Sequence, residues 1–415
     1  MLNRVVVTGL GALTPLGLNV QDFWENIING KSGAANITHF NAEKFKTQFA
    51  CELKDFKPEI FIEKKELRKL DLFSAYALIA VEQAIKDSNV NLEKVNLDNC
   101  GVIWGSGIGG LNTMVQEIGQ FYTNGQIPRF SPFFIPKMIS DIAAGLISIK
   151  YSFKGPNFAT VSACASATHS IIDSFNYIAL GHASLIVCGG SEASINEAGV
   201  GGFNALRALS TRNDNPEKAS RPFDIDRDGF VLGEGAGALI LEDYNHAKKR
   251  GAKIYCEITG IGVSADAYHL TAPHPEGLGA YKVMKKTIHQ ARKGYDEIDY
   301  INVHGTSTQL GDVTEIHAIK QLFGQSAYNV NISSTKSMTG HLLGAAGAIE
   351  SIASILSIQH GCIPPTINLE NLDPKLDPKI NYTANKYQTR DVRNALCNTF
   401  GFGGHNASVL FSRLN

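Results

Sequence analysis

Short runs of β-branched and apolar residues alternate along the chain with patterns typical of helices. Several runs are apolar at successive positions, as in strands that are covered on both faces. In one helical pattern, Ile349, Ile352 and Leu356 recur at the spacing of one helix face. The predicted helices include residues 72–86 and 346–358, and the predicted strands span residues 5–7, 185–188, 238–241, 254–258, 300–303, 330–333 and 408–411. This alternation predicts an α/β fold.

One short sequence occurs twice, as V-T-G-L-G at residues 7–11 and as I-T-G-I-G at residues 258–262. The repeat indicates two related halves, which we expect to span residues 1–253 and 254–415. No low-complexity segment or linker separates them, so we expect the halves to pack together. Residues 205–235 are rich in charge and lack apolar periodicity, and this pattern predicts a surface excursion.

The bulk composition excludes several classes of protein. The 415 residues are 44 % apolar, with 38 basic residues against 39 acidic ones, so no global field favours nucleic acid or an anionic membrane. Any charged partner must therefore be recognised by a local patch. Seven scattered cysteines without a C-x-x-C pair argue against a disulfide framework and favour a reducing cytoplasm. The chain starts almost directly with a strand, and no apolar run approaches membrane-spanning length, so we expect a soluble protein without a leader segment.

The first candidate for chemistry is Cys164. It lies where the β-branched residues Thr160 and Val161 give way to a helical pattern, with small residues on both sides. A thiol at such a strand-to-helix junction faces unpaired backbone N–H groups and the positive end of the helix dipole, which favour the thiolate. The dipole contributes only about 0.3 to 2 kcal/mol, so it assists activation without establishing it.

Two histidines lie in similar surroundings far downstream. His304 ends a predicted strand, where α/β sheets usually expose their chemistry, and His341 lies in another strand-to-helix passage. One cysteine with two histidines fits a Cys/His hydrolase, a metal site or an acyl-condensing enzyme. A hydrolase needs one histidine as base and a residue that orients it, whereas a condensing site gains from two imidazole donors on one carbonyl oxygen. Closely spaced ligands such as H-E-x-x-H are missing from the sequence, which argues against metal.

Several longer segments resemble the 3-oxoacyl-[acyl-carrier-protein] synthases, and most closely the type II elongation enzymes of fatty-acid synthesis. The resemblance covers essentially the whole chain and is carried by V-V-V-T-G-L-G at 5–11, G-S-G-I-G-G at 105–110, S-P-F-F at 131–134, A-C-A-S at 163–166, A-L-S-T-R-N at 208–213, R-D-G-F-V at 227–231, H-G-T-S-T at 304–308, S-S-T-K-S-M-T-G-H at 333–341 and F-G-F-G-G at 400–404. It implies an acyltransferase with the thiolase-like fold, in which two duplicated halves form a layered α/β/α/β/α core.

The same resemblance implies a role for each reacting group. Cys164 would accept an acyl chain as a thioester, and His304 and His341 would polarise the malonyl thioester carbonyl while CO2 leaves. Backbone N–H groups of Cys164 and Phe402 would hold the oxyanion, with Phe402 and Phe400 forming a gate. The imidazole at position 341 resembles an elongating enzyme, because initiating synthases carry asparagine there.

Further positions match supporting residues of the family. The expected groups are catalytic support by Lys336, Asp312, Glu315 and Glu350, pantetheine binding by Thr306 and Thr308, an acyl pocket at Ile108, Phe134 and Phe203, and carrier-protein docking at Lys65, Arg68, Lys69 and Arg207. Surface ions, loop-structuring hydroxyls, core packing and a solvated helix face are the respective alternatives. His405 and Gln309 depart from the common family residues, which bears on substrate preference.

The resemblance implies that acyl carrier protein is the partner and delivers both substrates, so we expect no cofactor beyond its phosphopantetheine arm. By analogy we expect a homodimer, without nucleic acid, membrane or metal. Two alternatives stay open: a ketosynthase of a polyketide or aryl-polyene pathway, and a non-catalytic chain-length factor. The second is disfavoured because Cys164, His304 and His341 are all present. A thiolase is disfavoured because a second catalytic cysteine pattern is missing around residues 401–405.

Overall fold

The computed structural model describes residues 2–414. Its strands are β1 (Val5–Leu13), β2 (Ala35–Asn36), β3 (Phe49–Ala50), β4 (Cys100–Gly105), β5 (Asn157–Thr160), β6 (Leu185–Glu192), β7 (Gly235–Asp243), β8 (Cys256–Ala265), β9 (Tyr300–Asn302), β10 (Asn331–Ser333), β11 (Cys362–Ile363), β12 (Gln388–Thr389), β13 (Asn394–Gly401) and β14 (His405–Ser412). Its helices are α1 (Val20–Ile28), α2 (Lys64–Leu67), α3 (Leu72–Ser88), α4 (Leu111–Thr123), α5 (Phe134–Met138), α6 (Ile142–Tyr151), α7 (Ser166–Ala179), α8 (Glu197–Ala205), α9 (Tyr244–Lys249), α10 (Leu278–Gln290), α11 (Gln309–Phe323), α12 (Lys336–Thr339) and α13 (Ala346–His360). Every predicted strand and helix is present.

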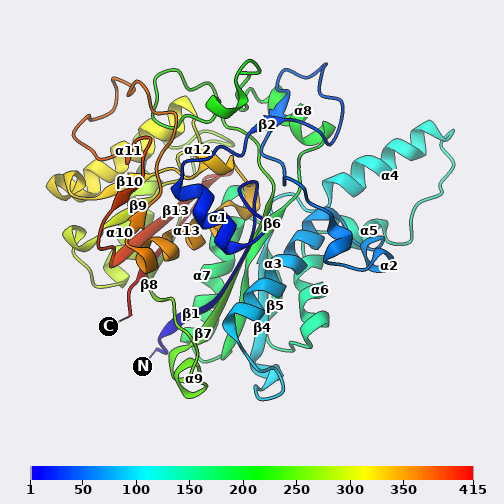
Figure 1. Cartoon of the computed structure of the whole chain (residues 1–415), viewed down its shortest axis with the longest axis horizontal. Coiled ribbons are helices and arrows are strands. Elements are labelled where there is room, and N and C mark those ends of the chain that lie inside the picture. The colour runs from blue at the N-terminus through cyan, green and yellow to red at the C-terminus, as the bar shows by residue number, and fades with distance from the viewer. Residues whose placement is uncertain (1, 415) are drawn as a thin grey trace.

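Ten strands form one continuous sheet in the order β10-β9-β13-β14-β8-β1-β7-β6-β4-β5. Five neighbouring strands come from each predicted half, and the halves meet where β1 and β8 pair over only three residues of each strand. Helices α7 and α13 pack against strands of both halves and against each other. Helices α3 and α6 cover the outer face of one half, and α10 and α11 cover that of the other (Figure 1). The predicted α/β/α/β/α layering is confirmed.

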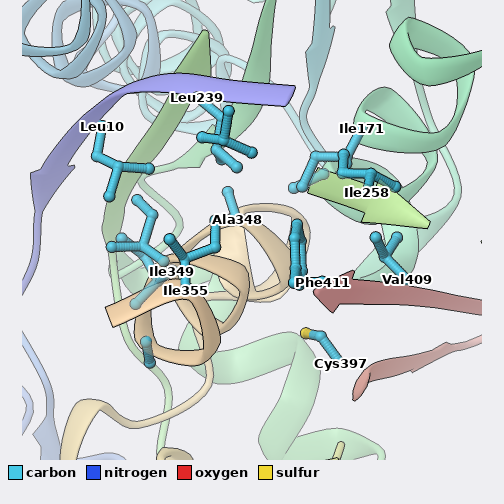
Figure 2. Close-up of a cluster of buried hydrophobic side chains, with 14 of the residues drawn as sticks. Leu10, Ile171, Leu239, Ile258, Ala348, Ile349, Ile355, Cys397, Val409 and Phe411 are labelled. Carbon is cyan, nitrogen blue, oxygen red and sulfur yellow. The ribbon is translucent and has the colours of Figure 1, made fainter. Parts of the chain in front are cut away.

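The central core fills the space between the two halves of the sheet. Ile349 on α13 belongs to one buried cluster with Leu239 of β7 and Phe411 of β14, so both halves contribute to it (Figure 2). The helix is buried along most of its length, which explains why its sequence is apolar on nearly all sides. The two halves are therefore held together by a shared hydrophobic layer.

The repeated pentapeptide performs the same task in both halves. In β1 the pairing with β7 slips at Thr8, and in β8 the pairing with β14 slips at Thr259, the corresponding position. A Cβ at Gly11 would overlap the carbonyl oxygen of Ala80 on α3, and one at Gly262 would collide with the backbone of α10. Glycine thus lets a helix approach each strand closely. The division at residues 253 and 254 remains a prediction.

The expectation for residues 205–235 was wrong for much of that segment. Arg227 is only 2 % exposed and forms ion pairs with Asp312 and Asp373 at 3.5 and 2.8 Å. Arg221 and Asp224 are also buried and pair at 3.0 Å. Buried charges persist when they are paired and hydrogen-bonded, and the partners of Arg227 lie far away in the sequence. The density of charged residues therefore predicted an exposed segment, whereas the fold buries several of these charges.

All seven cysteines are free thiols, and six of them are buried. Within residues 2–414, none of the helices has the length and apolar character needed to cross a membrane.

We expect Gly11→Ala to lower the free energy of unfolding by about 3 kcal/mol, because the added methyl group overpacks the contact with α3. Gly119→Ala on α4 is the matched control, since a Cβ there meets nothing within 4 Å. It should raise stability by about 0.5 to 1 kcal/mol, as alanine favours the helix. Urea unfolding followed by circular dichroism measures both changes. Equal stability of Gly11→Ala and the unchanged protein would contradict the close-approach explanation.

Candidate active site

Cys164 lies at the predicted strand-to-helix junction. It follows β5 within the 3₁₀ helix η3 (Ala163–Ala165), which leads directly into α7. The preceding Ala163 has a φ of 51°, a conformation that non-glycine residues seldom adopt. Ser166 stabilises this turn, because its hydroxyl donates to the carbonyl of Ala163 and accepts the N–H of Ser162. The turn presents a thiol that is 7 % exposed.

The structure brings both histidines to this thiol. Nε2 of His341 lies 3.1 Å from Sγ of Cys164, although the two residues are 177 positions apart. The rings of His304 and His341 lie with their centroids 5.3 Å apart and nearly perpendicular. One nitrogen from each imidazole and the sulfur all lie within 4.8 Å of one another. The three predicted groups therefore converge on a volume large enough for one reacting carbonyl group.

His304 is oriented by a buried ammonium group. Nζ of Lys336 contacts Nδ1 of His304 at 3.3 Å, donates to the carbonyl of His304 at 2.7 Å and pairs with Glu350. Because an ammonium has only donors, Nδ1 must accept, and the ring proton is on Nε2. Glu315 fixes the backbone by accepting the N–H groups of His304 and Gly305 at 3.0 and 2.9 Å. His304 therefore presents an N–H donor to the cavity.

Asp312 supports His304 indirectly, through the loop that follows it. It accepts the N–H groups of Ser307 at 3.1 Å and Phe223 at 3.0 Å, and it pairs with Arg227. It therefore holds the loop after His304 and does not orient the ring directly. Burial raises the pKa of Asp312 to about 6 and that of Glu315 to about 7, while the donated N–H groups oppose this rise.

His341 is held mainly through its backbone. Its N–H donates to Val231 at 2.7 Å, its carbonyl accepts from Gly233 at 2.9 Å, and its ring packs edge-on against Phe230. Nδ1 is buried and has no hydrogen-bond partner among the described residues. Sequence reasoning did not identify the role of Phe230, since an apolar residue next to a glycine gives no local sign of a histidine contact.

Burial determines the resting charge of the site. It raises the pKa of the Cys164 thiol to about 11, although Lys336 and the N–H group of Phe402 both lower it in part. It also holds the pKa values of His304 and His341 well below their usual range, helped by the charge of Lys336. The junction was expected to favour a thiolate. Desolvation outweighs that effect, so the resting site contains a neutral thiol and two neutral imidazoles.

A cavity of about 670 Å³ opens onto these groups. The predicted site residues in its lining are Cys164, His304, His341, Glu315, Phe400, Phe402, Thr306, Thr308, Ile108, Phe203 and Arg207. The lining also contains residues 271–274 of the loop after β8, which the sequence analysis did not identify because loop residues of this kind have no characteristic pattern. Gln309 lines the cavity, whereas His405 is exposed at the start of β14.

Some predicted residues lie elsewhere. Phe134 on α5 stacks against Phe130 and is not part of the cavity lining. The basic residues Lys65, Arg68 and Lys69 lie on or just after α2, whereas Arg207 follows α8 at the cavity. Figure 1 shows α2 and α8 in separate parts of the molecule. The structure therefore joins only Arg207 of the predicted docking residues to the cavity.

Comparison with known proteins gives a consistent result over the whole chain. The family description "Beta-ketoacyl synthase, N-terminal domain" matches residues 2–247, and "Beta-ketoacyl synthase, C-terminal domain" matches residues 255–370. Two relatives are named 3-oxoacyl-[acyl-carrier-protein] synthase 2. The protein from Coxiella burnetii is 47 % identical to this chain over 99 % of each chain. The protein from Synechocystis is 47 % identical over 99 % of this chain and 98 % of the relative.

Solved structures agree. A beta-ketoacyl synthase from Burkholderia phymatum has a TM-score of 0.92 with 34 % identity, and a type II polyketide ketosynthase in complex with its acyl carrier protein has a TM-score of 0.90 with 32 % identity. Both comparisons cover 100 % of each chain. The thiol and two imidazoles described above thus lie in the fold that these ketosynthases share, and the chain belongs to the beta-ketoacyl synthase family.

Proposed function

We propose that this enzyme elongates fatty-acyl chains by condensing malonyl-[acyl-carrier-protein] with an acyl group held on Cys164. The products are 3-oxoacyl-[acyl-carrier-protein], CO2 and free carrier protein. The observation that carries the proposal is the approach of His341 Nε2 to Cys164 Sγ at 3.1 Å, with a second donor imidazole in the same cavity. The two relatives of 47 % identity named above support the fatty-acid pathway.

In the first half of the reaction, the acyl chain moves from the carrier to the enzyme. The Cys164 sulfur attacks the thioester carbonyl, and its proton passes to Nε2 of His341, which lies within hydrogen-bond distance. N–H groups of Cys164 and Phe402 stabilise the oxyanion, in agreement with their effect on the thiol. The carbon–sulfur bond to the carrier then breaks, and the proton leaves with the pantetheine thiol.

In the second half, the malonyl group loses CO2. The bond between its methylene carbon and its carboxylate breaks, and the electron pair forms an enolate. Its oxygen accepts hydrogen bonds from Nε2–H of His304 and of His341. Nδ1 of His341 has no partner that holds a proton there, so once Cys164 is acylated the neutral ring takes the tautomer with its proton on Nε2. Neutral imidazoles suit this role because each retains an N–H donor without adding a full charge. The methylene carbon attacks the Cys164 thioester and the carbon–sulfur bond breaks. The released thiolate takes up one proton from solvent, which restores the neutral thiol.

The proposed partner is acyl carrier protein. Thr306 and Thr308, whose hydroxyls lie 3.0 Å apart in the cavity lining, would bind the phosphopantetheine arm. Arg207 at the cavity and Lys65, Arg68 and Lys69 near α2 would bind acidic side chains of the carrier. The phosphopantetheine arm brings both substrates, so this reaction needs no cofactor of its own. The proposed location of the enzyme is the cytoplasm.

We further propose a homodimer. Strand β5 forms one edge of the large sheet, and α4 extends away from the body of the molecule (Figure 1). The segment around these elements exposes many large apolar side chains, namely Met114, Ile118, Tyr122, Ile127, Phe130, Phe133, Ile135, Ile139, Ile149 and Val161. Apolar surface of this extent is usually covered by a partner, and a second copy would also pair the free edge.

A polyketide or aryl-polyene ketosynthase is the second candidate, because structural relatives include a type II polyketide ketosynthase. That relative is 32 % identical, whereas the relatives named 3-oxoacyl-[acyl-carrier-protein] synthase 2 reach 47 %. The fatty-acid reaction is therefore the preferred proposal.

The purified protein should extend saturated acyl carriers of some length between about C6 and C16 with malonyl carrier, and mass spectrometry should locate the intermediate on Cys164. Cys164→Ala should form no adduct and lose condensation by at least about a thousandfold, because the covalent intermediate cannot form. Cys362→Ala, at a half-buried thiol outside the cavity, is the matched control. Failure on every saturated chain would refute the fatty-acid assignment, and full activity of Cys164→Ala would refute the covalent route.

Alkylation of Cys164 by iodoacetamide should accelerate about tenfold per pH unit between about pH 8 and 10, because the thiolate fraction rises in that proportion below a pKa of about 11. Lys336→Met should slow alkylation at each pH, since the ammonium lowers the thiol pKa. Lys320→Met, an exposed position paired with Asp377, should leave the rate unchanged. A rate independent of pH across this range would show that the resting thiol is already ionised.

A further inference from the structure

A fully buried carboxylate lies at the carboxyl end of β6, outside the set of residues that the reaction uses directly. Glu192 is 0 % exposed. Its Oε2 accepts the N–H of Gly107 at 2.8 Å and that of Gly344 at 3.0 Å, and its Oε1 accepts the N–H of Ile108 at 3.2 Å. The hydroxyls of Ser106 and Ser194 lie at 3.4 and 3.5 Å.

Burying a carboxylate is costly unless several donors replace its water. Here the replacement consists of backbone N–H groups and hydroxyls, and together they counteract the effect of burial, which raises the pKa of Glu192 to about 7. An apolar residue would leave three buried N–H groups without acceptors, which destabilises the folded protein. The carboxylate of Glu192 therefore connects the loops whose N–H groups it accepts.

The connected loops are two walls of the active-site cavity. Gly107 and Ile108 belong to the loop after β4, and Gly344 belongs to the 3₁₀ helix η7 (Leu343–Ala345), which follows His341 closely. Gly107, Ile108 and Leu343 all line the cavity together with Cys164. Glu192 thus joins a wall from the first half of the chain to a wall from the second.

The second wall needs such a connection. Leu343 has a φ of 46°, in the left-handed region, which is strained for a residue other than glycine. Such a conformation persists only where neighbouring contacts impose it, and the bond from the next N–H group to Glu192 is one of these contacts. The position of the Leu343 side chain in the cavity therefore depends on the carboxylate.

We propose that Glu192 is a positioning residue that sets acyl-chain selectivity by fixing Ile108 and Leu343 in the wall of the cavity that receives the acyl group. The inference rests on the function proposed above. Both side chains line the cavity onto which Cys164 opens, and a long acyl chain contacts more of this lining than a short one. Loosening the walls therefore reduces the use of long chains more than that of short ones.

Two variants distinguish the hydrogen bonds that connect the loops from the negative charge of Glu192. In Glu192→Gln, one carboxylate oxygen becomes an NH2 group that faces at least one backbone donor, since both oxygens accept N–H groups. Glu192→Asp keeps the charge, but its shorter side chain cannot span both loops. Glu242→Gln is the matched control, because Glu242 is equally buried but lies near the opposite end of the paired strands β6 and β7.

The measured quantity is the ratio of kcat/KM for a C12 acyl carrier to that for a C4 acyl carrier. Both Glu192 variants should lower this ratio about tenfold, as expected for walls displaced by a fraction of an ångström. Glu242→Gln should lower the melting temperature and leave the ratio within about twofold, since it acts only through overall stability. An unchanged or increased ratio in folded Glu192→Gln and Glu192→Asp would overturn the inference.

Alkylation of Cys164 supplies a second readout. The charge of Glu192 raises the thiol pKa, so at about pH 8.5 Glu192→Gln should react faster than the unchanged protein, whereas Glu192→Asp should not. Equal alkylation rates in the unchanged protein and Glu192→Gln would contradict the placement of the carboxylate behind the thiol. If the unchanged protein extends no acyl carrier, the proposed function fails; if it does and the ratio stays constant, only the role of Glu192 fails.

Discussion

The active site depends on one buried cation. The ammonium of Lys336 is removed from water, with 1 % of the residue exposed, so each of its donors must find an acceptor within the protein. It finds Glu350 on α13, the carbonyl of His304 and the Nδ1 atom of the same ring. This set of contacts connects α12, α13 and the loop after β9 and assigns the proton of His304 to Nε2. Together with burial, the charge of Lys336 keeps both imidazoles neutral. The proposed chemistry requires all three outcomes.

The second condition is the close joining of two similar halves. Glycines in β1 and β8 let α3 and α10 lie against their strands, while α7 and α13 share one apolar layer between the halves. The nucleophile comes from one half and both histidines from the other. Their separation is therefore set by packing in this layer, and Glu192 adds a polar connection across the same boundary.

Sequence patterns predicted much of this arrangement because strands 185–192 and 235–243 and helix 346–360 are buried and largely apolar. Cys164, His304 and His341 could be identified because each lies in a rare segment that connects a strand to a helix. The pairing of Arg227 with Asp312 and Asp373 could not be predicted, since partners 85 or more positions away leave no local pattern. Nor could the neutral state of the thiol, because the sequence gives the junction but not the degree of burial.

The wide separation of the reacting groups along the chain has a consequence for synthesis. A ribosome releases Cys164 long before His304 and His341, the latter 177 residues later. The unfinished chain therefore carries a thiol with an ordinary reactivity, and neither the base nor the paired donors that would let it capture or cleave a thioester exist yet. Assembly of the site coincides with completion of the second half, so carrier-bound intermediates encounter either a nascent chain without the catalytic groups or a finished enzyme.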